Sequence, residues 1–402
     1  MKHIWSAALF GAALSMGLGT AAAAGISDGA VRIGVLTDMS GVYSAIGGKG
    51  SVEAAKLAIA DFGGKVLGKP ISLVYADHQN KADIGSAKAR EWIDTEHVDM
   101  ITDILNSAVG IAVQKLAAEK KVITINTGAG SSALTGADCT KYGIHYVYDT
   151  YSLPVGTATA IVDGGGKSWF FITADYAFGH SLEQNTSDVV KSLGGTVKGA
   201  VRAPLGTTDF SSYLLQAQAS GAQVIALANA GGDTINAIKQ ANEFGIVKAG
   251  QKMAGMLVFL SDVKSLGLPV AKGLNFTTAY YWNRNAESRK FAERYFKHMG
   301  SMPTMNHAGV YSAVKEYLDA VKAAGTDDPD AVRAELGKMK IDFFGVPGHI
   351  RKDGLMVHDM FLVKVKDPSE SKGPWDLLKI EHRIPGDKAF MTIAQGGCKM
   401  AQ

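Results

Sequence analysis

One glycine-rich stretch has the residue types and spacing of a dinucleotide-binding turn. Gly128–Ala133 follows an apolar run and matches the pattern G-x-G-x-x-A, with Asp149 about 20 residues further on. In a nucleotide-binding fold this turn opens a long helix, whereas here the segment Thr135–Asp138 interrupts any helix. We therefore expect Gly128–Ala133 to be a loop that lines a cleft, and we expect no cofactor.

Two other patterns match catalytic or metal sites only in outline. Ser312 and Lys315 form S-x-x-K, a nucleophile pair, but they lie in an amphipathic helical pattern without the companion motifs K-T-G or S-D-N. A solvated helix face is the simpler interpretation. His349 and His358 flank a hairpin pattern without metal-ligand spacing. The sequence thus predicts neither an enzyme nor a metal site.

The N-terminus has the pattern of a secretory signal peptide. Lys2 and His3 precede the apolar run Ile4–Leu18, and the small residues Ala22–Ala24 follow. The alternative is a membrane anchor, but the apolar run is shorter than the ~20 residues that a bilayer requires. We expect cleavage near Ala24, a mature chain that begins near Gly25, and a location outside the cytoplasm.

The composition argues against nucleic acid as a partner. The chain has 41 Lys and Arg against 38 Asp and Glu, a formal charge of +3, and no basic stripe with interleaved aromatic residues. With 402 residues, 47% of them hydrophobic, it is long enough for two domains with sizeable cores. The near balance of charge also gives no support for a membrane surface as a partner.

The chain has two cysteines, Cys139 and Cys398. In an oxidising compartment outside the cytoplasm, two cysteines most simply form one disulfide. Two free buried thiols are the alternative. No C-x-x-C pattern occurs, so the sequence gives no support for a redox-active site.

Strand-like and helix-like patterns alternate along most of the chain. The series begins with a buried strand pattern at Val31–Leu36 and restarts at Trp169–Thr173. Strands that alternate with helices of 10–15 residues predict parallel βαβ units, here in two similar α/β lobes. Later the order breaks, with successive helices at Glu287–Met299 and Met305–Ala324 and a last strand at Met360–Lys366.

The carboxyl ends of the predicted strands indicate where a ligand would bind. Ligands of doubly wound sheets bind outside these ends, and two lobes that face each other there would enclose a cleft. The segments concerned are rich in Gly, Ser, Asn and aromatic residues, and they are 38–46, 103–109, 127–131, 174–178 and 229–233.

Four segments carry a resemblance to a known family: Ile33–Gly41, Tyr75–Asp77, Asn106-Ser107 and Asp175–Gly179. Together they resemble the Leu/Ile/Val-binding (type I periplasmic binding protein) family, the exported solute-binding proteins of ABC transporters. The resemblance covers the mature chain. It implies two Rossmann-like lobes on a three-strand hinge, a periplasmic location, a small carboxylate ligand and a membrane permease as partner. The implied division is 25–150 plus 282–350 for lobe 1, and 151–281 plus 351–402 for lobe 2.

The resemblance also implies how the ligand is held. A serine at a strand-to-helix turn and a backbone loop one strand later grip the ligand carboxylate, and the matching positions are Ser107 and Gly128, Ala129 and Gly130. Amides at a helix N-terminus favour an anion. Alternatively, Ser107 serves only as a helix N-cap. The aromatic position of the family matches Phe178, with Tyr176 nearby.

The chain departs from the family where amino-acid binders hold the ammonium group. Ala230 stands where the family has a tyrosine, and apolar Met256-Leu257 stands where it has an acid. Asp233 is the only acid near this loop, and it fits better as a cap of the following helix. A buried ammonium without a partner costs several kcal/mol. These departures predict a carboxylate ligand that lacks an amino group.

Further segments are similar to the branch of the family that takes up aromatic acids, namely Asn229–Asp233, Tyr281-Trp282 and Gly396–Cys398. That branch also implies the disulfide between the two cysteines. A flat ring between aromatic side chains needs no counter-ammonium. The alternative ligand is a branched-chain or other amino acid, with Asp233 as the ammonium partner. The expected aromatic walls are Tyr43, Tyr151, Tyr176, Phe178, Tyr280 and Tyr281, with Asn229 or Asp233 as a polar contact.

Overall fold

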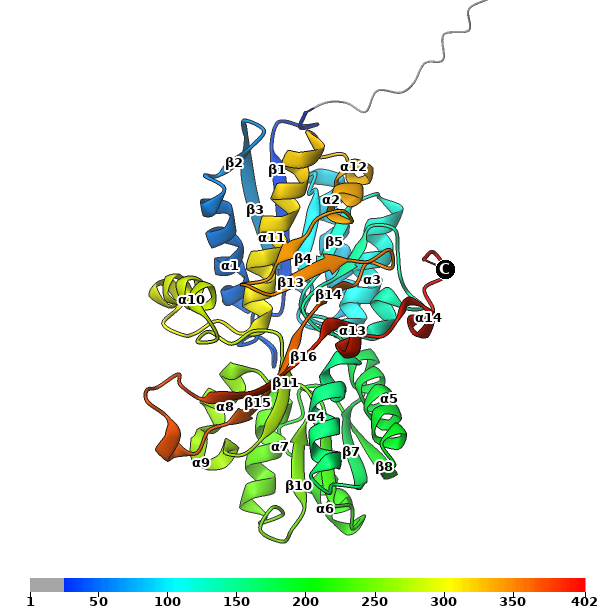
Figure 1. Ribbon diagram of the computed structural model, residues 1–402. Helices are drawn as coiled ribbons and strands as arrows, with labels where there is room; N and C mark the ends of the chain where they lie inside the picture. The colour runs from blue at the N-terminus through cyan, green and yellow to red at the C-terminus, as the bar shows by residue number, and fades with distance from the viewer. Residues whose placement is uncertain (1–24, 402) are drawn as a thin grey trace, which may run out of the picture.

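The protein folds into two lobes that lie one above the other in the computed structural model (Figure 1). The structure describes residues 25–401, so the predicted signal peptide lies outside the described residues. Each lobe has a mainly parallel sheet covered by helices, which confirms the predicted fold class of two Rossmann-like α/β lobes. Within the described part of the chain, no helix is both long and apolar enough to cross a membrane.

The sheet of the first lobe, the upper one in Figure 1, has buried, mainly apolar strands at its centre. Its central strand Val31–Thr37 is buried along almost its whole length, because helices on both faces leave no solvent side for polar residues. Pairing is parallel except for a short hairpin at one edge. In spatial order the strands are β2 (Lys65–Val66), β3 (Lys69–Asp77), β1 (Val31–Thr37), β4 (Met100–Asp103), β5 (Ile123–Asn126) and β6 (Gly143–His145).

Helices cover both faces of this sheet, and each face has its own cluster of buried side chains. On one face a Cβ at Gly34 would stand 2.8 Å from the ring of Trp92, so glycine permits the close approach of that ring. That face carries α2 (Ala82–Thr95) and α3 (Ser107–Glu119), and the other carries α1 (Gly48–Asp61), α10 (Ala286–Met299), α11 (Met305–Ala324) and α12 (Pro329–Leu336).

The second lobe repeats the plan around four parallel strands. A Cβ at Gly179 would lie 2.0 Å from the carbonyl oxygen of Ala174, so this glycine lets a helix N-terminus approach the end of the central strand. In spatial order the strands are β10 (Lys252–Gly255), β9 (Val224–Ala228), β7 (Ser168–Ala174) and β8 (Thr196–Ala203). The helices are α4 (Ser152–Asp163), α5 (Ala177–Ser192), α6 (Ser211–Ala219), α7 (Gly232–Glu243), α8 (Leu260–Leu266) and α9 (Leu268–Ala271).

Antiparallel strands run along the junction between the lobes (Figure 1). They are β11 (Asn275–Thr278), β15 (Met360–Val365) and β16 (Leu378–Ile384). The prediction that Met360–Lys366 is the last strand is therefore wrong, because β16 follows it. A smaller antiparallel sheet precedes β15 and consists of β12 (Ile341–Asp342), β13 (Pro347–Ile350) and β14 (Met356–His358).

The chain after β16 returns to the first lobe. Cys398 is bonded to Cys139 across 259 residues, which confirms the predicted disulfide. The predicted division assigned all of 351–402 to lobe 2, whereas Cys398 is tied to a first-lobe cysteine and Leu355 is bridged to His145. The other boundaries of the division stay a prediction. The tail contains α13 (Gly386–Ala389) and α14 (Ile393–Gly396), and α14 packs on the 3-10 helix η1 (Ser132–Thr135).

Candidate functional site

A small cavity lies between the lobes. Its residues follow β1, β4, β5 and β6 in the first lobe and β7, β9 and β10 in the second, so it lies at carboxyl ends of strands, as doubly wound sheets predict. Its free volume is about 20 Å³, room for about one water molecule, so an organic ligand requires the lining or the lobes to move. Its lining is Tyr43, Ile46, Leu105, Ser107, Gly128, Ala129, Gly130 and Tyr148, with Tyr176, Phe178, Ala230, Leu257 and Phe259 opposite.

Ser107 lies at the first position of α3, with its backbone amide at the helix N-terminus. The N-cap is Asn106, whose side chain accepts from the amides of Ala108 and Val109, so the alternative of Ser107 as the cap is wrong. The hydroxyl oxygen of Ser107 accepts from the amide of Ser131 at 3.1 Å. Among the hydrogen bonds of the described residues, the Ser107 amide donates to no protein group. It is therefore available to an anion, which the helix dipole favours.

The loop after β5 uses most of its own amides to hold its shape. The amide of Gly128 donates to the carbonyl of Asp103 at 2.9 Å, and that of Ala129 donates to the side chain of Asn126 at 2.9 Å. In this loop the amide of Gly130 has no acceptor among the described residues. The expectation that Gly128 and Ala129 offer amides to a carboxylate is thus wrong, although both residues line the cavity.

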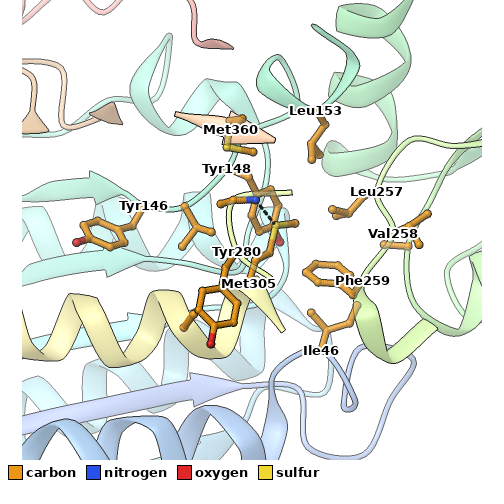
Figure 2. Close-up of a cluster of buried hydrophobic side chains, with 14 of the residues drawn as sticks. Ile46, Tyr146, Tyr148, Leu153, Leu257, Val258, Phe259, Tyr280, Met305 and Met360 are labelled. Atoms are coloured by element: carbon orange, nitrogen blue, oxygen red, sulfur yellow. Dashed lines mark hydrogen bonds between the residues drawn. The ribbon is translucent and has the colours of Figure 1, made fainter. Parts of the chain in front are cut away.

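Aromatic rings form most of the remaining wall. Tyr148 and Phe259 meet edge to face with ring centroids 6.0 Å apart, and Tyr176 and Phe178 lie at the same separation. Figure 2 shows Tyr148 and Phe259 together with Ile46 and Leu257. The expected walls Tyr43, Tyr176 and Phe178 do line the cavity, whereas Tyr280 does not. Rings in such arrangements offer flat apolar surfaces to a flat ligand.

Two tyrosine hydroxyls join the lobes beside the cavity. The hydroxyl oxygens of Tyr43 and Tyr176 are 2.6 Å apart, and the hydroxyl of Tyr148 donates to the carbonyl of Gly128 at 2.6 Å. Burial raises the pKa of all three phenols above the ordinary value, so each stays neutral at physiological pH. The polar groups around the cavity are therefore hydroxyls and amides.

The wall that would face a ligand ammonium is apolar. Ala230 and Leu257 line it, as the sequence predicts, and the lining contains no acidic side chain. Asp233 lies in the first turn of α7 but does not line the cavity. Its side chain accepts from the amide of Gly206 rather than from α7, so the expectation that it caps this helix is wrong. Burial raises the pKa of Asp233 to about 7.

Three other predicted ligand residues point elsewhere. Tyr151 is half-buried beside α4 and lies outside the lining. The side-chain oxygen of Asn229 accepts from the hydroxyl of Thr234 at 2.6 Å, which turns it toward α7. The hydroxyl of Tyr281 is 3.4 Å from the carboxylate of Asp376. Loop position alone thus misplaced these side chains.

Sequence reasoning missed four lining residues, namely Ile46, Leu105, Tyr148 and Phe259. Apolar residues of a ligand wall have the same composition as the core, so no sequence pattern separates them. Their place near strand ends was the only available signal. No group of three or more metal-ligating side chains occurs within residues 25–401, and both ring nitrogens of His358 contact backbone carbonyls.

Comparison with known proteins agrees with this geometry. A Leu/Ile/Val-binding protein homolog (homolog 6) of Brucella melitensis is 26% identical over 79% of this chain and 82% of its own length. A periplasmic binding protein of Burkholderia mallei is 55% identical over 94% of this chain and 100% of that one, with a TM-score of 0.92. A branched chain amino acid ABC transporter periplasmic ligand-binding protein of Burkholderia xenovorans is 43% identical, with coverages of 92% and 100% and a TM-score of 0.82.

The same fold occurs in an ABC transporter solute-binding protein of Rhodopseudomonas palustris in complex with 4-hydroxybenzoate. It has a TM-score of 0.80 and 24% identity over 89% of this chain and 97% of that one, a likeness that shows the fold alone. The model of the periplasmic binding protein family matches residues 30–374, most of the chain. The protein therefore belongs to the periplasmic binding protein family, as a ligand-binding component of ABC transporters.

Proposed function

We propose that this protein binds a small aromatic carboxylate, of the benzoate or hydroxycinnamate type, in the cavity between its lobes and delivers it to the permease of an ABC importer. The composition of the cavity carries the proposal: five aromatic rings, aliphatic side chains and no charged side chain. An α-amino acid would bury its ammonium against Ala230 and Leu257 at a cost of several kcal/mol. An aromatic acid without an ammonium avoids this cost.

The amides of Ser107 and Gly130 are the proposed partners of the ligand carboxylate. Both belong to lining residues and neither donates to another described residue. An amide that donates to a carboxylate forms a charge-assisted hydrogen bond, roughly twice as strong as a neutral one. The ring of the ligand would then lie among Tyr148, Phe178 and Phe259.

Delivery would use closure of the lobes around the ligand. The closed arrangement is held by the bond between Tyr43 and Tyr176 and by the amide of Gly232, which donates to the carbonyl of Val42 at 3.1 Å. A ligand that contacts both lobes shifts the population toward this form, which the permease would recognise. The proposal also includes export of the protein by its signal peptide. The ligand would be released to the permease without chemical change.

A branched-chain amino acid is the second candidate ligand. One carboxylate oxygen of Asp233 is buried without a hydrogen bond, and its charge acts on the hydroxyls of Tyr43 and Tyr176. The relative from Burkholderia xenovorans is described as a branched chain amino acid transporter protein. A reorientation of Asp233 would be needed before it met an ammonium in the cavity.

A thermal-shift screen of the mature chain from Gly25 separates the candidates. Benzoate, 4-hydroxybenzoate and 4-hydroxycinnamate are compared with leucine, isoleucine, valine and glutamine. A ligand at 100 times its Kd stabilises the native state by about 2.7 kcal/mol. Stabilisation by the aromatic acids alone supports the proposal, and stabilisation by leucine or isoleucine alone overturns it. Chromatography of the ligand after incubation should recover it unchanged.

The variant Ser107→Ala tests the anion end of the site. It removes the hydroxyl that accepts from Ser131 and so loosens the loop that carries Gly130. We expect the shift produced by the aromatic acid to fall, while Ser192→Ala, at an exposed position at the end of α5, leaves it unchanged. Equal shifts in the two variants would place the carboxylate elsewhere.

A further inference from the structure

A second, larger cavity lies on the first lobe, between α10, α11 and β12. Its volume is about 360 Å³ and it shares no residue with the cavity between the lobes. Three packed rings form its apolar part. The centroid of the Phe291 ring lies 4.6 Å from that of Tyr311 and 5.2 Å from that of Phe344. Ser312 also lines it, buried and hydrogen-bonded to the hydroxyl of Tyr146, so the expected solvated face is wrong there.

A buried carboxylate with only a long ion pair lines this cavity. Glu316 is 5% exposed, and its ion pair with Lys315 is longer than a hydrogen bond. The nearest cation is the ammonium of Lys315 at 3.8 Å, and that ammonium is held instead by Asp319 at 2.8 Å. Burial raises the pKa of Glu316 to about 7, although the charge of Lys315 acts in the opposite direction.

The other charges of the lining leave an excess of acid. Arg294 is fully matched, because it binds Asp61 through two hydrogen bonds of 2.6 and 2.8 Å. Asp342 and Glu287 also line the cavity, against Lys290. In total the lining has four acidic and three basic side chains. An additional positive charge would therefore be favourable here, most of all beside Glu316.

We infer that this cavity is a second binding site, for a small organic ammonium with an aromatic or apolar body. The nitrogen would pair with the carboxylate of Glu316 in a charge-assisted hydrogen bond. The body would lie on the rings of Phe291 and Phe344, which attract cations and apolar groups alike. The site is independent of the proposed ligand in the cleft.

Calorimetric titration of the mature chain with benzylamine at pH 8 tests this site, and benzyl alcohol serves as the neutral analogue. We expect benzylamine to bind at least tenfold more tightly than benzyl alcohol. Glu316→Gln should lower the affinity for benzylamine at least tenfold. Glu119→Gln, at an exposed position on α3, should leave that affinity unchanged. Equal affinity in wild type and Glu316→Gln, or no binding of benzylamine, would overturn the inference.

Two measurements keep these results interpretable. Glu316→Gln removes a buried charge, and the ammonium of its neighbour Lys315 keeps its shorter bond to Asp319, so the thermal midpoint of Glu316→Gln should be at or above that of the wild type. Ser107→Ala should leave benzylamine binding intact, which separates this site from the cleft.

The affinity for benzylamine should also rise with pH between 6 and 8 in the wild type and stay flat in Glu316→Gln. The ionised carboxylate is the form that pairs with an ammonium, and Glu316 ionises in this interval. A pH profile that is the same in both proteins would contradict the assignment. The charged groups that face Glu316 are Asp61 from α1, Glu287, Lys290 and Arg294 from α10, Lys315 and Asp319 from α11, and Asp342 from β12.

Discussion

At the scale of single residues, Gly130 sets the width of the cavity. A Cβ at this position would lie 3.1 Å from the ring of Phe178 and 3.2 Å from that of Tyr148. Gly130→Ala should therefore weaken the binding of an aromatic acid by about tenfold or more, a loss of about 1.4 kcal/mol of binding free energy. Gly373→Ala is the matched control, since its Cβ would meet no atom within 4 Å. Equal Kd values in calorimetry for the two variants would disprove this role.

His145 makes the stability of the fold depend on pH through its contact with the loop that carries Gly130. Its ring is buried, its Nε2 donates to the carbonyl of Ala129 at 2.7 Å, and burial lowers its pKa from about 6.5 to about 4. The folded state thus binds fewer protons than the unfolded state in this interval, so the stability that neutral His145 contributes is lost as pH falls from about 6.5 toward 4.

Urea unfolding at pH 7 and pH 4.5 measures this contribution. From pH 7 to pH 4.5 the free energy of unfolding should fall in both proteins. The fall should be on the order of 2 kcal/mol larger in the wild type than in His145→Gln. His349→Gln, at an exposed position, should behave like the wild type. If both variants lose as much as the wild type, protonation of His145 does not govern the acid response.

The sequence predicts those site residues whose role follows from backbone position. Ser107, Gly130, Tyr176 and Phe178 follow strands of a doubly wound sheet, and all four line the cavity. The direction of a side chain within such a loop has no sequence signal. Asn229 therefore fails as a prediction, because its hydrogen bond to Thr234 inside the same turn decides its direction.

At the scale of elements, the disulfide fixes the C-terminal tail beside the loop that carries Gly130. Cys398 joins Cys139, and α14 packs on η1, the 3-10 helix that follows this loop. Closing so long a loop restricts the unfolded chain by up to about 5 kcal/mol in the chain-entropy model. Cys139→Ser with Cys398→Ser should lower the free energy of unfolding by up to this amount in urea titrations. No change in the free energy of unfolding upon loss of the disulfide would show that this cross-link does not stabilise the fold.

Elements with strong local signals are predicted to the residue, and weak ones are missed. Met305–Ala324 is confirmed because Thr304 caps its start and Gly325 ends it at a φ of 69°. The helix Ser152–Asp163 was missed, since it contains a proline and a glycine and has no polar face. The strand Leu378–Ile384 was missed because polar residues alternate along it and a bulge interrupts its pairing with β15. Tertiary packing decides such segments.

At the scale of the whole molecule, the lobes are joined across the cavity by the hydroxyls of Tyr43 and Tyr176. Tyr176→Phe removes this bond, whose net value is about 1 kcal/mol, so the affinity for the ligand should fall by roughly fivefold. Small-angle scattering should show a larger radius for the ligand-free variant than for the ligand-free wild type. Tyr75→Phe is the control, because Tyr75 is exposed. Unchanged affinity and radius in Tyr176→Phe would mean that other contacts close the lobes.

Under the proposed function, the apolar wall at Ala230 and Leu257 would determine which class of ligand the whole molecule carries. Calorimetric titration with 3-phenylpropionate and with L-phenylalanine tests this most directly, because the two ligands differ only by the ammonium group. An unpaired ammonium in the cavity costs several kcal/mol, so 3-phenylpropionate should bind at least about a hundredfold more tightly. Tighter binding of phenylalanine would show that the cavity holds an ammonium and that the protein transports amino acids.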